Sequence, residues 1–227
     1  MRLLDVTRAV DAAGLVPRGA FRPRPEDQVP DLPDGRPAAT VVLAGDAGGR
    51  MWRAFASQRA DAADPLDAWT RTVLDRVAAA TGGYAVYPFG GPPHHPFQRW
   101  AQRAEPVTPS PLGILIHPRW GLWHAYRGAL VYAEAFDVPP RADIASPCET
   151  CRDRPCLSAC PVGAFSGPSY AVDRCADHVR SVAGGDCRVA GCLARRACPV
   201  GREFAQGPEQ AAFHMAAFLR ARPHRTP

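Results

Sequence analysis

The stretch Cys148-Glu-Thr-Cys-Arg-Asp-Arg-Pro-Cys-Leu-Ser-Ala-Cys-Pro161 decides the second half of the fold, because it gathers four cysteines in one short segment. These are Cys148, Cys151, Cys156 and Cys160, and no cysteine precedes them. A second group follows at Cys175, Cys187, Cys192 and Cys198, and its last member again precedes a proline. Two cysteine runs that each end on Cys-Pro are typical of a module with two iron–sulfur clusters. The sequence therefore predicts electron-transfer chemistry.

The ligand pairing follows from a rule for such modules. The cysteine before proline ligates the cluster of the other run. The first cluster then takes Cys148, Cys151, Cys156 and the remote Cys198. The second cluster takes Cys175, Cys187, Cys192 and the remote Cys160. Each [4Fe–4S] cluster receives four thiolates, and all eight cysteines are used.

Two other interpretations of the cysteines remain open from the spacing. Four residues separate Cys151 from Cys156, whereas two are found in the common bacterial run, so another iron–sulfur arrangement is an alternative. Two zinc sites of four cysteines each are a second alternative, although zinc ribbons usually carry two C-x2-C knuckles and this chain has one. His178 lies one helical turn after Cys175, but four thiolates already fill each site, so we expect it outside the ligand set.

Composition and charge narrow the class of protein. The chain has 227 residues, 46% of them hydrophobic, and a formal net charge of +5, with arginine as its only strongly basic residue. The N-terminus has no apolar signal-peptide core, and no apolar stretch approaches the roughly 18 residues of a membrane span. We expect a cytoplasmic protein without a membrane, where thiols stay reduced and disulfides are disfavoured. The arginines are scattered, so we expect no nucleic-acid partner. The predicted iron–sulfur clusters need a source of electrons, so we expect a redox partner protein as electron donor.

Local sequence signals divide the chain into three parts. Over residues 1–140, predicted helices at 2–14, 64–80 and 97–101 alternate with predicted strands, which indicates a layered α+β domain. The expected strands are 40–44, 84–87, 112–116 and 128–133, and the proline-rich stretch 17–37 is expected to be irregular. Residues 141–207 hold the cysteines and have too small a core to fold without their clusters. Residues 208–227 form a final helix and tail.

One stretch of the first domain carries an unusual set of side chains. It reads Gly113-Ile-Leu-Ile-His-Pro-Arg-Trp-Gly-Leu-Trp-His-Ala-Tyr-Arg-Gly128, and it leaves one predicted strand to enter another. Polar groups gathered at such a turn are able to face a ligand. The alternative is a buried aromatic turn in which His117 is satisfied by backbone hydrogen bonds.

This stretch resembles the cobalamin-processing chaperones of the CblC type, which carry a similar I-H-P-R-aromatic-G-x-W-x-x-x-R-G segment. Asp64-Pro65-Leu66-Asp67 is similar to the D-P-V-D helix start of that family. The resemblance implies a nitroreductase-like fold for residues 1–140 and a base-off cobalamin. It also implies His117, Trp123 and Arg127 as cofactor-binding residues, with Arg127 at the position associated with the thiol and cofactor pocket.

The order of the two halves resembles a second group of proteins. Epoxyqueuosine reductases and corrinoid reductive dehalogenases join a CblC-like domain to a ferredoxin-like module with two [4Fe–4S] clusters. The resemblance implies an iron–sulfur oxidoreductase whose clusters pass electrons to a corrinoid or to a substrate in the same pocket. A ferredoxin-like electron carrier with a docking domain and a corrinoid-handling chaperone are the alternatives. No residue is predicted to be catalytic.

Overall fold

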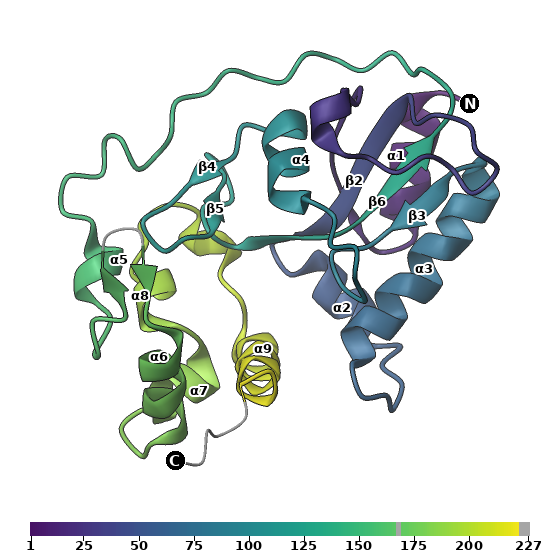
Figure 1. Cartoon of the computed structure of the whole chain (residues 1–227). Helices are drawn as coiled ribbons and strands as arrows, with labels where there is room; N and C mark the ends of the chain where they lie inside the picture. The colour runs from purple at the N-terminus through teal and green to yellow at the C-terminus, as the bar shows by residue number, and fades with distance from the viewer. Residues whose placement is uncertain (167–168, 223–227) are drawn as a thin grey trace. The chain divides into compact units, whose positions relative to one another are not determined.

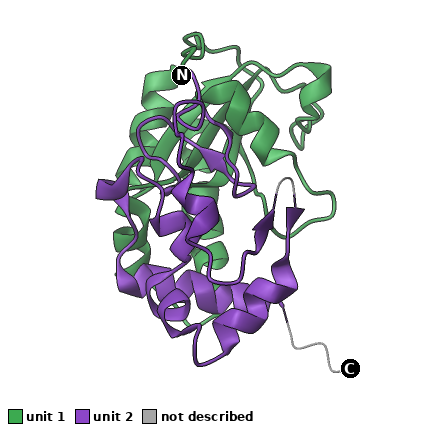
Figure 2. Cartoon of the chain, turned by 90° about the vertical axis from the view of Figure 1, so that its left-hand side faces the viewer, with its two compact units in different colours: residues 1–106, 124–144 green, residues 107–123, 145–227 purple. Residues whose placement is uncertain are grey.

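The computed structural model describes residues 1–166 and 169–222, and the chain forms two compact units (Figure 2). Unit 1 comprises Met1–Pro106 and His124–Ile144, and unit 2 comprises Val107–Trp123 and Ala145–Pro227. The segment 107–123, which the sequence analysis placed within a first domain of residues 1–140, thus groups with the cysteine segment. None of the described helices combines the length and the apolar character that crossing a membrane requires.

Unit 1 is built on a four-stranded antiparallel sheet in the order β1-β2-β6-β3 (Figure 1). The strands are β1 (Val16–Phe21), β2 (Thr40–Ala47), β3 (Tyr84–Val86) and β6 (His124–Tyr132). The run of apolar residues in β2 is buried because this strand is central and pairs with β6 from Thr40–Tyr132 to Ala47–His124. The predicted strands at 40–44 and 84–87 are therefore confirmed, and the fold is α+β as expected.

Four helices accompany this sheet: α1 (Leu3–Ala12), α2 (Arg50–Ala56), α3 (Pro65–Thr81) and α4 (Phe97–Ala104). Pro65 occupies the first turn of α3, where its missing N–H is not needed, and Gly82 ends the helix with a φ of 67°. Between these ends α3 buries Leu66, Trp69 and Leu74 among others. The predicted helix at 64–80 is confirmed because local signals mark both of its ends.

Two parts of the predicted strand pattern are wrong. β1 lies in the proline-rich stretch that was expected to be irregular; an edge strand of this kind accepts Pro17 because only one side is paired. The expected strand at 112–116 does not join the main sheet. Its last residues form β5 (Leu115–Ile116), which pairs only with β4 (Thr108–Pro109) in a separate two-stranded sheet.

Unit 2 consists of short helices around the cysteine segment. These are α5 (Pro155–Ser158), α6 (Val172–Arg180), α7 (Gly185–Ala190), α8 (Leu193–Arg196) and α9 (Pro208–Arg220). A small hairpin pairs β7 (Phe165–Ser166) with β8 (Ser169–Tyr170), and two 3-10 turns, Pro25–Asp27 in unit 1 and Arg202–Phe204 in unit 2, complete the elements. The final helix predicted from residue 208 is confirmed. The unit's core contains cysteines as well as aliphatic side chains, which is unusual for so small a region.

Candidate functional site

Four of the eight cysteines line one cavity of unit 2. They are Cys160, Cys175, Cys187 and Cys192. Short helices position them: Cys160 follows α5, Cys175 and Cys187 lie within α6 and α7, and Cys192 is the residue before α8. Phe165, Leu193 and Met215 are among the apolar side chains of the remaining wall. The cavity therefore presents four thiols in a mainly apolar surrounding, with His178 also in its wall.

The other four cysteines form a second group. Burial raises the pKa of the Cys148 thiol, and the neighbouring thiols of Cys198, Cys156 and Cys151 raise it further. Cys156 and Cys198 are buried in the core of unit 2 beside Leu112, Ile116 and Leu122. The structure thus places four cysteines at one cavity and the thiols of Cys148, Cys151, Cys156 and Cys198 near one another, and Cys160 and Cys192 also pack against the core that contains Cys156 and Cys198.

The chemistry of the first cavity suits a cluster of several metal ions. Four cysteines line this cavity, and its other walls are mainly apolar. The backbone N–H of Ala164 donates a hydrogen bond to Cys160 Sγ at 3.3 Å, which stabilises a thiolate. Four thiolates with apolar walls and backbone donors to sulfur are what a [4Fe–4S] cluster requires.

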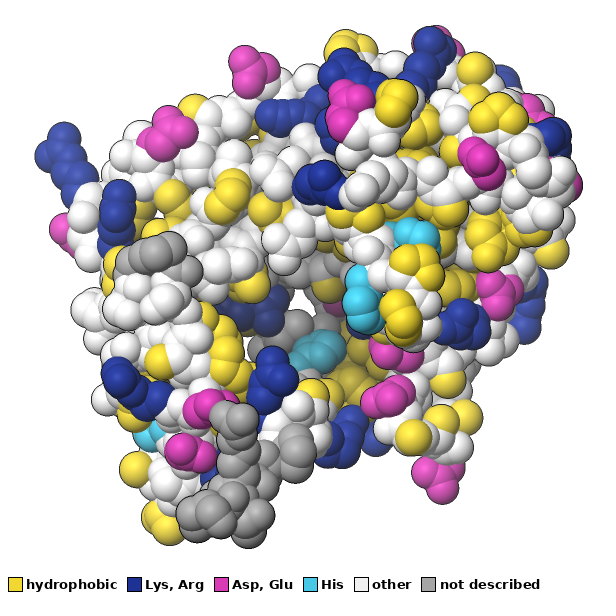
Figure 3. Space-filling view, viewed as in Figure 1, with side chains coloured by type: hydrophobic (Ala, Val, Ile, Leu, Met, Phe, Trp, Pro, Cys, Tyr) yellow, Lys and Arg dark blue, Asp and Glu magenta, His cyan; other side chains and the backbone are white. Residues whose placement is uncertain are grey.

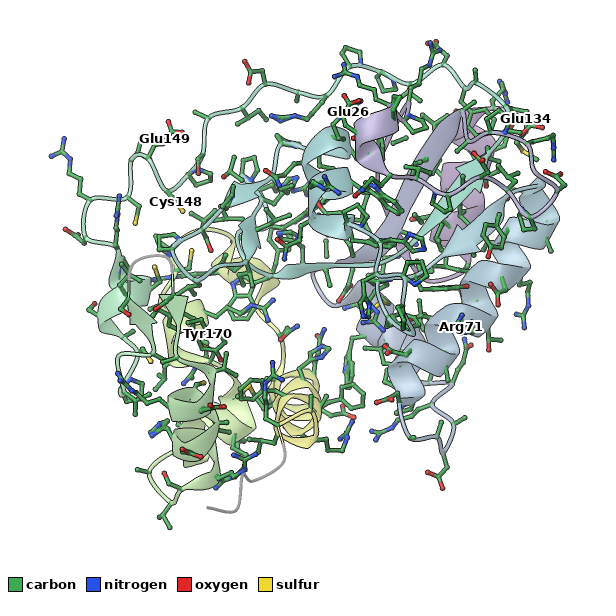
Figure 4. The ribbon with its side chains drawn as sticks, viewed as in Figure 1. Glu26, Arg71, Glu134, Cys148, Glu149 and Tyr170 are labelled. Atoms are coloured by element: carbon green, nitrogen blue, oxygen red, sulfur yellow. The ribbon has the colours of Figure 1, made fainter. Side chains whose placement is uncertain are left out.

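An aromatic pair borders this cavity. Tyr170, labelled in Figure 4, lies on β8 and stacks on Phe165 of the cavity wall with 4.8 Å between ring centroids. Burial raises the pKa of the Tyr170 hydroxyl, and the nearby thiols of Cys175, Cys192 and Cys160 raise it further. The phenol therefore stays protonated at neutral pH and is able to donate its proton in a hydrogen bond to a thiolate sulfur.

His117 organises the turn that follows β5. Its Nδ1 accepts hydrogen bonds from the backbone N–H groups of Arg119 (3.0 Å) and Trp120 (3.3 Å), and its ring stacks on that of Trp120 at 4.2 Å. The backbones of His117 and Gly121 close the turn with two hydrogen bonds of 2.9 Å. This geometry matches the structural alternative for His117, in which the imidazole is satisfied by backbone groups.

Two glycines allow close backbone contact between this turn and the second cysteine run. A Cβ on Gly121 would lie 1.9 Å from the Val200 carbonyl oxygen, and a Cβ on Gly201 would lie 2.5 Å from the Trp120 carbonyl carbon. Both glycines also have positive φ, at 55° and 69°. Because Val200 follows Cys198-Pro199 directly, the position of this ligand loop depends on backbone-to-backbone contact with the turn.

Arg195 makes a second connection between the turn and the cysteine run. Its guanidinium lies 4.5 Å from the centre of the Trp123 ring, and its Nε donates to the Leu122 carbonyl oxygen at 3.0 Å. Trp123 is only 7% exposed, yet its indole Nε1–H has no hydrogen-bond partner among the residues that the structure describes. The sequence analysis did not identify Arg195, although its place between Cys192 and Cys198 was a usable signal.

Arg127 lies on β6 in unit 1, whereas His117 and Trp123 belong to unit 2. It forms an ion pair with Asp67 in the first turn of α3, and its guanidinium lies 5.1 Å from the centre of the Phe89 ring. The Arg127 Nε is buried and has no hydrogen-bond partner within residues 1–166 and 169–222. The D-P-L-D helix start and the R-G strand, which were noted separately in the sequence, therefore meet through Asp67 and Arg127.

A buried charge network in unit 1 was not foreseen from the sequence. Arg18 is fully buried, and its Nη2 donates to Glu105 Oε2 at 2.7 Å. The same carboxylate accepts a 2.6 Å hydrogen bond from the Tyr126 hydroxyl, and Arg18 also donates to the carbonyl oxygen of Asp46 at 2.8 Å. Burial raises the pKa of Tyr126, so its hydroxyl remains a donor. The network thus links strands β1, β2 and β6 to Glu105, the residue that follows α4.

Comparison with known proteins identifies the fold. No protein-family model matches the sequence, and no curated protein matches it. Epoxyqueuosine reductase from Bacillus subtilis has a similar structure, with a TM-score of 0.54 and 14% identity over 92% of this chain and 69% of that one. A selenomethionine-labelled epoxyqueuosine reductase gives a TM-score of 0.53, also at 14% identity, over 92% of this chain and 68% of that one.

The enzyme from Streptococcus thermophilus extends this likeness, with a TM-score of 0.50 and 14% identity over 88% of this chain and 66% of that one. The chain is therefore similar in fold to epoxyqueuosine reductases over nearly its whole described length. Identities of this size show a shared fold, and they do not by themselves assign the same substrate. The part of the sequence resemblance that concerned this architecture is confirmed at the level of fold.

Proposed function

We propose that the protein is an iron–sulfur oxidoreductase that carries two [4Fe–4S] clusters in unit 2 and passes electrons to a corrinoid or a substrate bound by the N-terminal domain. The observation that carries the proposal is the cavity lined by Cys160, Cys175, Cys187 and Cys192. One of these residues belongs to the first cysteine run and three to the second, as the cross-over arrangement requires. The fold shared with epoxyqueuosine reductases supports the same class of activity.

The chain's own groups would give the clusters their environment. When bound, the clusters supply one-electron transfer. Cys148, Cys151, Cys156 and Cys198 would hold one of them among the aliphatic side chains of the unit's core. The four cysteines of the cavity would hold the other, with the Ala164 N–H directed at Cys160. Apolar walls limit water access, and both burial and hydrogen bonds to sulfur set the reduction potential of such centres.

Two buried hydrogen-bond donors of the stretch 113–128 support the proposal that a ligand binds there. Trp123 presents an indole Nε1–H without an acceptor in unit 2, and Arg127 presents an Nε–H without an acceptor in unit 1. Buried donors of this kind are normally satisfied, so each calls for an acceptor atom from a bound molecule. His117 would act indirectly, by holding the turn that carries Trp123.

Metal analysis of paired cysteine variants tests the cluster assignment. After anaerobic reconstitution the wild-type protein should contain about eight iron and eight sulfide per chain. The double variant Cys160→Ser/Cys175→Ser should keep about half of the iron, because both residues belong to one cluster. The double variant Cys160→Ser/Cys156→Ser should lose nearly all of it. The reverse result would refute the cross-over pairing, and zinc without sulfide would refute the clusters.

A titration with cobalamin tests whether a corrinoid accepts the electrons. Addition of cobalamin to the reconstituted protein should give a base-off visible spectrum that shifts to reduced cobalt when the clusters are reduced. Arg127→Ala should weaken this binding without loss of iron, whereas Arg76→Ala, an exposed arginine of α3, should leave it unchanged. If the protein does not change the cobalamin spectrum, a corrinoid cofactor is excluded, and the alternative function as an electron carrier is favoured.

A further inference from the structure

We propose that the corner between α6 and α7 is the docking surface for an acidic, one-electron donor protein. This corner is defined by the exposed residues Ser181, Val182, Ala183 and Val189 together with Arg180, Arg188 and Arg222 at its edge. The inference rests on the proposed function, because it names the partner that supplies electrons to the clusters.

The corner is a fixed structure rather than a loose loop. The Ser181 N–H donates to the Asp177 carbonyl oxygen at 3.1 Å, and Arg188 Nη1 donates to the carbonyl oxygens of Val179 (2.5 Å) and Ser181 (3.2 Å). A Cβ on Gly184 would lie 1.9 Å from the His178 carbonyl oxygen, so the chain passes directly against α6. The loop therefore has one defined conformation that is available to a partner in advance of binding.

The apex of this fixed corner exposes apolar side chains. Val182 is 97% exposed and Val189 is 56% exposed. Single exposed apolar residues are common on protein surfaces, but here two of them flank Cys187 of the predicted second cluster in the sequence. Val179 and Cys187, which precede and follow Val182 in the chain, both line the cavity, so the apex belongs to a segment that borders it.

The net positive charge of unit 2 indicates an acidic partner. Unit 2 contains 12 arginines and seven acidic residues, whereas unit 1 contains 15 of each, so all of the net positive charge lies in the unit that holds the cysteines. At the corner, Arg180 donates a hydrogen bond to the Arg222 carbonyl oxygen, which brings the end of α9 beside the end of α6. In Figure 3 apolar, arginine and acidic side chains are interspersed at the lower left, where Figure 1 places α6 and α7.

An acidic donor fits this combination for a physical reason. Opposite charge accelerates the encounter of two proteins, and a small apolar contact then fixes the complex without making it long-lived. Electron-transfer complexes are of this weak class, with buried areas below about 1,200 Å². The corner exposes Val182 and Val189, which offer apolar contact. Its three arginines outnumber the two exposed carboxylates beside them, Asp177 and Asp186, so its charge has the sign that an acidic donor needs.

Reduction kinetics with a flavodoxin, as a defined acidic one-electron donor, test the proposal. The reconstituted full-length protein should be reduced by flavodoxin hydroquinone at a rate that falls as salt concentration rises. Val182→Asp should lower the second-order rate constant at least tenfold, and Arg222→Glu should lower it at low salt but not at high salt. The matched controls Leu4→Asp and Arg141→Glu, both at exposed sites of unit 1, should retain the wild-type rate.

Chemical reduction separates this proposal from the proposed function. All four variants should contain wild-type iron and should be reduced by dithionite at the wild-type rate, because a small reductant does not use a docking surface. A wild-type flavodoxin rate in both Val182→Asp and Arg222→Glu would overturn the docking surface. Absence of iron, or clusters that dithionite does not reduce in the wild-type protein, would instead overturn the oxidoreductase function.

Discussion

Replacing Gly121 with alanine tests whether the turn after β5 and the loop after Cys198 depend on direct backbone contact. The added methyl group would lie 1.9 Å from the Val200 carbonyl oxygen, where a carbon–oxygen contact normally requires about 3.3 Å. Backbone on both sides leaves no flexible side chain to move aside. The new residue would also keep a φ of 55°, which L-residues adopt at a cost of about 1–2 kcal/mol.

Gly113→Ala is the matched control for this substitution. Gly113 belongs to the same segment and has a φ of 74°, but a Cβ there has nothing within 4 Å. It therefore carries the conformational cost alone, whereas Gly121→Ala adds a steric cost of about 1–3 kcal/mol. We expect Gly121→Ala to be less stable than Gly113→Ala by about 2 kcal/mol, or about 1 M in urea midpoint for a typical dependence on denaturant.

Urea denaturation and the rate of iron release measure the two consequences. Gly121→Ala should release iron faster than Gly113→Ala, because the displaced Val200 is two residues after Cys198. Equal urea midpoints for the two variants would refute the packing argument. Equal iron release with unequal midpoints would show that the turn stabilises unit 2 without fixing the ligand loop.

Two further predictions concern unit 1. Glu105→Gln should destabilise the protein by about 3–5 kcal/mol in chemical denaturation, because it leaves the fully buried Arg18 without its counter-charge. Glu26→Gln, at an exposed site, should have little effect. Equal denaturation midpoints for the two variants would contradict the buried ion pair. Burial raises the pKa of Tyr132 to about 12, against about 10 in an unfolded chain. The folded state thus holds this proton more tightly, so stability present below pH 10 should be lost as the pH rises through 12, and Tyr132→Phe should reduce that loss in pH-dependent denaturation; an unchanged pH profile would exclude Tyr132 as its source.

Some features of the fold could be predicted because neighbouring residues encode them. Pro65 and Gly82 mark the two ends of α3, and the apolar run of β2 identifies a buried strand, so both elements were predicted correctly. The cysteine groups follow in the same way from spacing and from the prolines after Cys160 and Cys198. In each case the signal lies within a few residues of the feature it predicts.

Other features depend on residues that are far apart in the chain. Arg18 and Glu105 form their buried pair across 87 positions, and Arg127 and Asp67 form theirs across 60. Nothing in the residues around Arg18 distinguishes it from the exposed arginines of the same chain. Pro17 of β1 and the prolines that follow it indicate an irregular segment, and only the pairing with the neighbouring strand β2 shows that an edge position accepts Pro17.

The sequence by itself determined that this chain holds two sets of four cysteines, because ligand spacing is a local property. Only the tertiary structure decided that residues 107–123 belong with those cysteines rather than with the sheet whose strand β6 follows them. The physical reason is the contact between Gly121 and Val200, where two backbones approach more closely than any side chain allows. Gly121 in the sequence shows only that another part of the chain is able to approach its backbone closely, and the folded chain shows that this part is Val200.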